Sequence, residues 1–525
     1  MRSETGSRPG NDTGTDARSG GAESGDRAED LKQGGRWPAL AVCLVGGFMT
    51  VLDISIVNVA LPDIRGSLGA SAGDLQWVLS GYALAFGLVL VPAGRLGDAH
   101  GRRMMFMIGL AMFTLTSALA GVATGPLWLI IARFAQGLAS GTLNPQVAGL
   151  IQQLYRGAQR GRAFGLLGAV IGISTAIGPL LGGALILAGG ATDGWRWVFY
   201  VNVPIGLLAL PAAWKLLPPA RERDAAQDGK RDGDGAQDPP RSLDPVGIGL
   251  LGCAVIALLV PLVEAQQWSG WGKWLLIPAG LALLAGFVLW ERGQPDPAVS
   301  LGLFSRRSFS LGTALALCYF GGFTALFFIF TLYLQNGLGR SALIAGLAIT
   351  PFAAGSAGAA AVGGRLVERA GRTLVACGIA AVAVGLGGAL IAVHAVSGPG
   401  VAWATAAPLL LAGVGSGLVI APNQTITLSE VPVREASTAA GVLQTAQRIG
   451  SAIGVAAVGA VFFGGLPGGG QAGGGSSGGG HGSGGSGLLW ADAFERGLIV
   501  IIALVGLSLL IALADVLSER RAKRV

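Results

Sequence analysis

Long apolar runs of about 20 residues recur along the whole chain, and no other feature limits the possible folds as strongly. A helix of about 20 residues crosses a bilayer, because each residue advances about 1.5 Å through a hydrocarbon core about 30 Å thick. Only 12% of the residues are charged, roughly half the share found in soluble domains. A single soluble globule is therefore excluded, and the sequence predicts an all-α polytopic membrane protein.

Fourteen such runs can be distinguished by eye. They lie at about residues 37–61, 76–94, 105–123, 127–151, 163–188, 197–217, 244–265, 273–291, 309–335, 342–364, 373–394, 401–423, 439–463 and 496–516. With the amino terminus inside, the inner segments hold 28 Lys and Arg residues and the outer loops hold three. Cytoplasmic loops carry such an excess, so we expect both termini in the cytoplasm and a multi-pass protein of the inner (plasma) membrane. The net charge of +7 then reflects inner loops, and no nucleic-acid partner is expected.

A nine-residue pattern, G-R-L-x-acid-x-x-G-R, occurs twice, at residues 94–102 and 364–372. Each copy follows the second helix of a six-helix block and lies on the cytoplasmic side. The sequence therefore predicts two six-helix halves with two helices inserted between them. Parallel halves of this kind occur in secondary transporters, whose substrate site lies between the halves near the middle of the membrane.

The predicted domain order follows from these blocks and from composition. The segments are a disordered cytoplasmic tail (1–36), an N-terminal six-helix half (37–217), a cytoplasmic linker (218–243), two inserted helices with the following loop (244–308), a C-terminal six-helix half (309–516) containing a Gly-rich extracellular loop (464–487), and a basic cytoplasmic tail (517–525). The linker is rich in charge, Pro and Gly, and the loop is mostly Gly and Ser, so neither is expected to pack a core.

The first copy of the repeat resembles the loop between the second and third helices of the major facilitator superfamily. The matching residues are Gly94, Arg95, Asp98, Gly101, Arg102 and Arg103. The resemblance implies that the arginines and Asp98 form a charge cluster at the inner face, which locks helices together when the transporter faces outward. A merely basic inner loop is the alternative.

The fifth run resembles the G-x5-G-P-x2-G-G signature of antiporters in that superfamily. Its residues are Gly172, Gly178, Pro179, Gly182 and Gly183. Small residues allow helices to approach closely, and Pro removes one helical hydrogen bond. The resemblance implies exchange of substrate for protons, whereas a Gly-rich packing face is the structural alternative.

Three further segments are similar to the fourteen-helix drug:proton antiporter branch of the superfamily. They are 52–62 (LDISIVNVALP), Arg133-x-x-Gln136-Gly137, and 195–204 (WRWVFYVNVP). This branch contains multidrug and antibiotic efflux transporters. The resemblance covers about residues 37–515 and is most specific in the N-terminal half.

Ionisable residues inside spans are costly and indicate function by default, and Asp53, Arg133 and Arg448 lie well inside their runs. Asp53 and Arg133 lie at similar depths from the outer face, so the sequence allows them to meet. We interpret Asp53 as the proton-carrying group and Arg133 as its modulator, with a static ion pair as the alternative. Arg448 has no evident acidic partner. A substrate cavity is a further hypothesis, for which the candidates are Asn58, Gln136, Tyr82, Tyr319, Phe323 and Phe327; packing or lipid contact is the ordinary explanation of the aromatic ones.

Three classes of function are compared. A proton-coupled exporter of amphipathic small molecules agrees with the antiporter signature and the buried acid. A nutrient uptake carrier would offer several polar groups at mid-membrane, whereas these runs are largely Ala, Gly, Leu and Val. An enzyme or receptor lacks support, because no metal, Walker or nucleophile motif is present in a suitable context. We therefore expect no enzyme activity, no cofactor and no ATP site, and a monomer driven by the proton gradient, with protons, a small molecule and the lipid bilayer as its partners.

Overall fold

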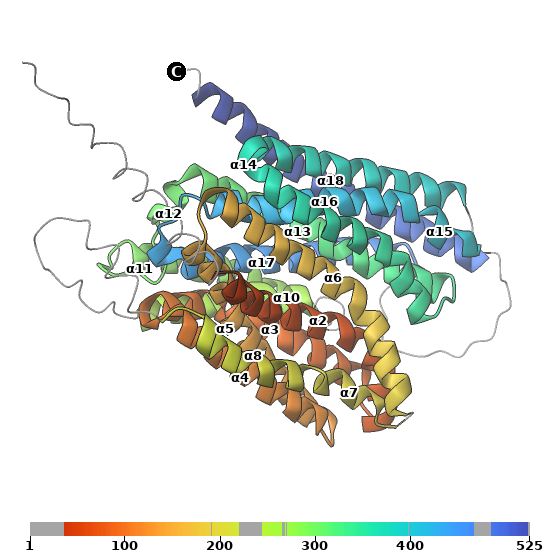
Figure 1. Ribbon diagram of the computed structural model, residues 1–525. Helices are drawn as coiled ribbons and strands as arrows, with labels where there is room; N and C mark the ends of the chain where they lie inside the picture. The colour runs from red at the N-terminus through yellow and green to blue at the C-terminus, as the bar shows by residue number, and fades with distance from the viewer. Residues whose placement is uncertain are drawn as a thin grey trace, which may run out of the picture.

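The computed structural model describes residues 36–190, 192–219, 244–264, 268, 270–396, 398–466 and 485–522. Every regular element in these ranges is helical, in agreement with the predicted all-α class (Figure 1). The N-terminal tail, the linker at 218–243 and the Gly-rich loop at 464–487 lie almost wholly outside the described residues, so those three expectations stay predictions.

The N-terminal half is a bundle of long helices followed by one broken helix. Its elements are α2 (Arg36–Leu68), α3 (Ala72–His100), α4 (Arg102–Gly121), α5 (Pro126–Leu154), α6 (Gly157–Gly189), α7 (Gly194–Tyr200) and α8 (Asn202–Leu216). The short α7 and α8 follow one another with a single residue between them. Helix α3 begins with a capping box in which Ser71 and Asp74 satisfy each other's backbone N–H groups, which fixes where the second span starts.

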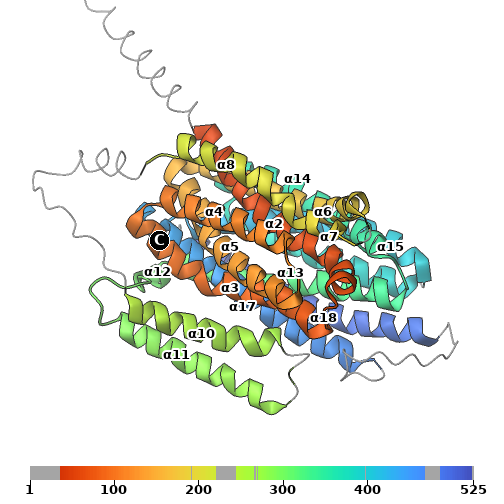
Figure 2. The same cartoon turned by 90° about the horizontal axis from the view of Figure 1, so that it is seen from below.

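Two inserted helices form a hairpin beside the bundle. They are α10 (Pro245–Val263) and α11 (Leu276–Glu291), and a 3-10 turn (Trp271–Leu275) precedes α11. Figure 2 shows the two helices side by side at one edge of the molecule. Leu259 of α10 packs on α3, 3.0 Å from the position that a Cβ on Gly87 would occupy. The hairpin therefore covers one side of the bundle and does not lie between the halves.

The C-terminal half repeats the long-helix pattern. Its elements are α12 (Gly302–Ser305), α13 (Arg307–Leu332) with a π-helical turn (Tyr333–Gly337), α14 (Ala342–Ala395), α15 (Val401–Ala404), α16 (Ala406–Thr427), α17 (Ala436–Gly464) and α18 (Gly485–Ala522). Helix α18 continues six residues past 516, the end that we expect from the apolar run. Hydropathy marks only the part of a helix that lies in hydrocarbon, and the charged turns beyond it remain helical.

Twelve helices in the described ranges are long and apolar enough to cross a membrane. One of them is α14, whose 54 residues would measure about 80 Å as a single helix. It contains a non-helical residue at Gly371, so two helices meet there. Helix α5, with 29 residues, is not among the twelve. The expected total of fourteen spans stays a prediction.

Both copies of the nine-residue repeat end a helix at a glycine with positive φ. Gly101 follows α3 with φ 104°, and Gly371 breaks α14 with φ 51°. Residues other than Gly rarely adopt positive φ, because their Cβ atom clashes with the backbone. The repeated glycine therefore has a backbone role in each half, as the internal symmetry of the sequence predicts.

Two seams of small residues join the halves. At one, a Cβ on Gly94 of α3 would lie 2.5 Å from the carbonyl oxygen of Ser437 on α17. At the other, a Cβ on Gly161 of α6 would lie 2.6 Å from the carbonyl oxygen of Gly364 on α14. Each half thus presents its copy of the repeat to a helix of the opposite half. Backbones this close leave no room for larger residues.

Candidate functional site

A buried ion pair between α2 and α5 forms the centre of the site. The Nη1 atom of Arg133 lies 2.6 Å from Oδ2 of Asp53. The Asp53 side chain is 0% exposed and that of Arg133 is 1% exposed. The structure therefore brings together the two residues that their depths in the sequence allow to meet.

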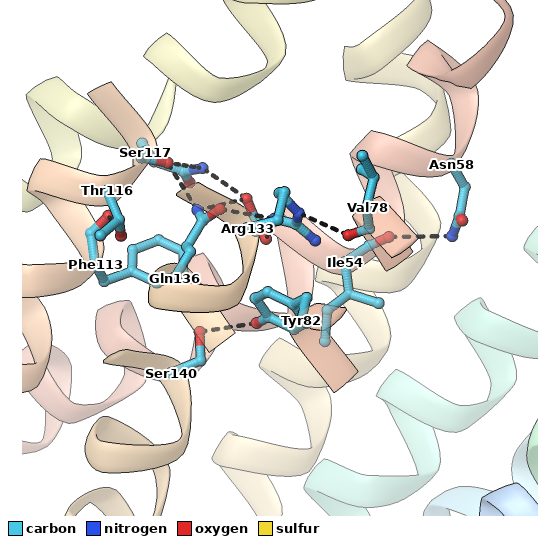
Figure 3. A network of polar contacts seen from close by, with 12 residues as sticks. Ile54, Asn58, Val78, Tyr82, Phe113, Thr116, Ser117, Arg133, Gln136 and Ser140 are labelled. Atoms are coloured by element: carbon cyan, nitrogen blue, oxygen red, sulfur yellow. Dashed lines mark hydrogen bonds and ion pairs between the residues drawn. The ribbon is translucent and has the colours of Figure 1, made fainter. Parts of the chain in front are cut away.

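Amide and hydroxyl groups from three more positions complete a network around this pair (Figure 3). Gln136 Nε2 donates to Asp53 Oδ1 at 2.9 Å and to Ser117 Oγ at 2.9 Å. Asn202 Nδ2 donates to Ser117 Oγ at 3.1 Å and lies 3.4 Å from Asp53 Oδ1. Both oxygens of the carboxylate are therefore used, and α2, α4, α5 and α8 are joined in one place.

Arg133 has partners besides the carboxylate. Its Nη1 atom donates to Gln136 Oε1 at 2.7 Å, and its Nε atom donates to the Val78 carbonyl at 3.4 Å. The guanidinium carbon lies 4.2 Å from the ring centroid of Tyr82, whose hydroxyl donates to Ser140 at 2.8 Å. These contacts would continue to hold the cation if Asp53 lost its charge. Without these contacts, an arginine whose carboxylate partner became neutral would be a buried charge with unsatisfied donors.

Sequence reasoning did not select Asn202, Ser117 or Ser140 as site residues. Asn202 lies inside the segment 195–204, and a polar amide next to a long apolar run is a signal that identifies it. Ser117 and Ser140 are ordinary small residues of transmembrane helices. Only their positions in space distinguish them.

At the end of the bundle that the sequence predicts to face the cytoplasm, Asp98 caps a helix of the opposite half. Its carboxylate accepts hydrogen bonds from the backbone N–H groups of Ser437 and Thr438, at 3.1 and 2.8 Å, and from the Thr438 hydroxyl at 2.8 Å. Arg102 donates to Asp98 Oδ1 at 2.6 Å and to the Ser437 hydroxyl at 2.9 Å. The carboxylate thus neutralises the positive end of the α17 dipole, and the halves are closed against each other here.

The other two arginines of this loop contact residues outside that cluster. Arg95 pairs with Asp296, which lies between α11 and α12, at 2.5 Å. Arg103 donates to the backbone carbonyl of Trp214 and lies over that residue's ring, 4.8 Å from the centroid. The expectation of one shared cluster is corrected in part: Arg102 pairs with Asp98, whereas Arg95 and Arg103 have the partners Asp296 and Trp214.

Helix α6 carries the antiporter signature, and one face of it contacts the C-terminal half. A Cβ on Gly172 would lie 3.0 Å from the backbone nitrogen of Ala357 on α14. Pro179 lies on the same side, 3.2 Å from the position of a Cβ on Gly346. Helix α6 continues through Pro179 without interruption.

A second face of α6 packs inside its own half. A Cβ on Gly178 would lie 2.4 Å from Ser55 Oγ, and one on Gly182 would lie 2.9 Å from Ile56 Cγ1, both on α2. Gly183 faces open space, where a Cβ would meet nothing within 4 Å. The signature thus contains residues with three different surroundings, two of them tightly packed.

The candidate cavity residues also differ in their surroundings. Those that are almost fully buried are Gln136, Tyr82 and Tyr319. Those that are more accessible are Asn58, Phe323 and Phe327. The two phenylalanines belong to an aromatic cluster on α13 and α14, with ring centroids 5.1 Å apart. A substrate role for the six residues stays a prediction.

Two other features bear on the chemistry. Arg448 on α17 has its guanidinium carbon 4.3 Å from the ring centroid of Phe86 on α3, so it contacts the opposite half. In the described ranges, no group of three or more His, Cys, Asp or Glu side chains is placed to hold a metal ion.

A family profile described as Major Facilitator Superfamily matches residues 43–455. The chain is 36% identical over 431 residues to a protein of Streptomyces coelicolor named "Probable actinorhodin transporter", covering 81% of this chain and 72% of that one. It is 33% identical over 431 residues to the "Tetracenomycin C resistance and export protein" of Streptomyces glaucescens, covering 81% and 76%. The fold resembles the crystal structure of the human organic anion transporter MFSD10 with a TM-score of 0.62 and 14% identity, covering 91% and 99%.

Proposed function

This chain belongs to the major facilitator superfamily, and we propose that it is a proton-coupled antiporter that exports amphipathic small molecules from the cytoplasm. Membership of that family and transporter-named relatives indicate a transporter of small molecules rather than an enzyme. The direction of transport rests on the relatives whose names include export or resistance. Drugs, antibiotics and secondary metabolites are the substrate classes that this comparison favours.

The observation that carries the proposal is the fully buried pair of Asp53 and Arg133. A proton on Asp53 removes the negative charge and leaves Arg133 as a buried cation, so protonation and the separation of the pair are coupled. The contacts of Arg133 with Gln136, Val78 and Tyr82 lower the free-energy cost of that separation. A carrier can then take up a proton on one side of the membrane and release it on the other.

In an alternating-access cycle, the contacts at the two seams between the halves would break and re-form. Asp98 and the α17 terminus hold the inner face closed, and the small residues of α6 and α14 let the halves change their angle. In this proposal, breaking the Asp98 cap opens the inner face to substrate from the cytoplasm. The energy source is the proton gradient, and no bound cofactor or ATP takes part.

The proposal includes the finer architecture expected from the sequence. It assigns fourteen spans, both termini in the cytoplasm and a monomer in the plasma membrane. Twelve apolar helices, the break at Gly371 and the 29-residue α5 support the number.

Reconstitution into lipid vesicles tests the proposal. An imposed pH step should drive uphill accumulation of a fluorescent substrate by the wild type, and Asp53→Asn should abolish it while substrate still equilibrates. Gln152→Glu is a useful control, because it changes the charge of a buried α5 residue away from the pair. An Asp53→Asn protein that still concentrates substrate would exclude Asp53 as the proton carrier. Loss of expression or thermal stability alone would instead favour the static ion pair.

A further inference from the structure

Arg448 is a cation in the middle of a membrane-spanning helix. It lies 12 residues after the start of α17 at Ala436, which corresponds to about 18 Å along the helix axis. An ionisable side chain at that depth is costly and needs a compensating partner. The proton-coupling scheme above makes no use of it.

The surroundings of Arg448 stabilise its charge without using its donors. The guanidinium lies 4.3 Å from the Phe86 ring centroid, a cation–π contact that satisfies the charge but accepts no N–H in the plane of the guanidinium. Among the residues that the structure describes, no hydrogen bond or ion pair reaches this side chain. The side chain is half-buried. Arg133, by contrast, is fully buried against a carboxylate.

The position of Arg448 along the seam matters as much as its contacts. Closer to the cytoplasm, α17 meets α3 through close packing, and a Cβ on Gly441 would lie 2.5 Å from the Leu90 carbonyl oxygen. Arg448 lies seven residues further out, two turns on the same face. There, an aromatic ring and a long side chain replace the close backbone contact. The guanidinium therefore lies beyond the part of the seam where the two backbones are in close contact.

An aromatic pair separates this cation from the buried ion pair. The rings of Tyr82 and Phe86 are stacked, with centroids 6.2 Å apart and an interplanar angle of 27°. Arg133 lies over Tyr82 and Arg448 over Phe86. Asp53 neutralises Arg133, whereas Arg448 has no counterion among the residues that the structure describes.

We propose that Arg448 binds the anionic group of the transported molecule, so that the substrates include aromatic amphiphiles carrying a carboxylate or phenolate. This inference rests on the proposed transport function and specifies its substrate class. A carboxylate accepts two parallel hydrogen bonds from a guanidinium, which adds geometric selectivity to charge attraction. The unneutralised cation repels a cationic molecule by the same term.

Two dyes with the same xanthene ring and opposite charge test the proposal. Fluorescein is an anion at neutral pH and rhodamine 6G is a cation. Their binding to the purified full-length chain in lipid nanodiscs is measured by fluorescence anisotropy, without any proton gradient. We expect fluorescein to bind the wild type more tightly than rhodamine 6G does. Arg448→Gln should raise the fluorescein dissociation constant about tenfold or more, as expected for a lost charge-assisted contact. The dissociation constant of rhodamine 6G should instead fall, because the variant removes the charge that repels it.

Two further variants keep the test decisive. Arg448→Lys retains the charge without the planar fork and should weaken fluorescein less than Arg448→Gln does. Arg292→Gln removes an exposed arginine that follows α11 and should leave both affinities unchanged. An equal loss of affinity for both dyes in Arg448→Gln would show that Arg448 only stabilises the contact between the halves, and would overturn the proposal. Fluorescein affinity that is equal in wild type and Arg448→Gln, or weaker than that of rhodamine 6G in the wild type, would also overturn it.

The outcome is independent of whether the protein is an antiporter. Binding is measured at equilibrium, so a failure of proton-driven export in vesicles leaves the dye result intact. Conversely, charge-blind binding with intact proton-driven export would remove the anion site and keep the proposed function.

Discussion

Replacing Asp98 by Asn should open the inner face of the protein. The carboxylate of Asp98 is 0% exposed and accepts two backbone N–H groups at the start of α17, the Thr438 hydroxyl and the Arg102 guanidinium. The neutral amide has one acceptor oxygen in place of two, and its NH2 group faces donors. The contact between the halves is therefore weakened while the side-chain volume is kept.

The size of the effect follows from the contacts that are lost. The Asn oxygen still accepts one hydrogen bond, so the variant loses one acceptor and the charge. A lost hydrogen bond costs about 0.5–1.5 kcal/mol, and a charge near a helix terminus contributes about another 0.3–1 kcal/mol. A total of about 0.8–2.5 kcal/mol changes a two-state population ratio by roughly 4- to 70-fold. We therefore expect the ratio of inner-open to inner-closed molecules to rise by that factor.

Distances between spin labels measure this ratio. Labels at Arg162→Cys on α6 and Arg369→Cys on α14 use exposed inner positions in opposite halves. The four native cysteines are first replaced, because Cys253 and Cys377 are exposed. Pulsed dipolar spectroscopy then gives the short-distance and long-distance populations, and Asp98→Asn should increase the long-distance one.

A matched control separates the seam from general inner-face charge. Asp296→Asn removes a carboxylate that pairs with Arg95 and leaves the contacts between Asp98 and α17 in place, so the label distances should stay as in the wild type. Unchanged distances in Asp98→Asn would refute the reasoning, since the cap would then contribute nothing to closure. Equal opening in both variants would show that net charge, and not the cap, holds the face closed.

Three further predictions concern packing, the polar network and topology. Gly178→Leu should abolish transport at normal expression, because its Cβ would lie 2.4 Å from Ser55 Oγ and force α2 away from α6. Gly183 faces open space, so Gly183→Leu should transport like the wild type. Equal activity of the two variants in vesicles would contradict this. Asn202→Leu should lower the apparent melting temperature in detergent, at a cost of roughly 1–3 kcal/mol, yet keep uphill transport because the ion pair remains; loss of coupling with unchanged stability would argue against it. A tag after Val525 should be protected from protease added to intact cells while a tag between α17 and α18 is cut, and the reverse pattern would invert the topology.

Much of the fold is visible in the sequence because it depends on the residues of each segment alone. The apolar runs correspond to long helices, and the repeat at 94–102 and 364–372 marks the two positions, Gly101 and Gly371, where a glycine with positive φ ends a helix. The meeting of Asp53 with Arg133 was also accessible, since depth along a span is a matter of counting residues. The number of spans remains a prediction, because α14 joins two helices at Gly371 and α5 is not among the twelve apolar helices.

Apart from the pair of Asp53 and Arg133, only the tertiary structure showed which distant residues are in contact. Asp98 and Thr438 are separated by 340 positions, and only the packing of α3 on α17 makes one a cap for the other. The same is true of Asn202 near Asp53, and of Arg448 over Phe86. The free energy of transferring a residue from water into lipid depends mainly on its own side chain, so it can be judged from the sequence of each segment. A hydrogen bond or ion pair requires two groups within about 3 Å, and that distance is set by the close contact of glycine-lined helices that are far apart in the chain.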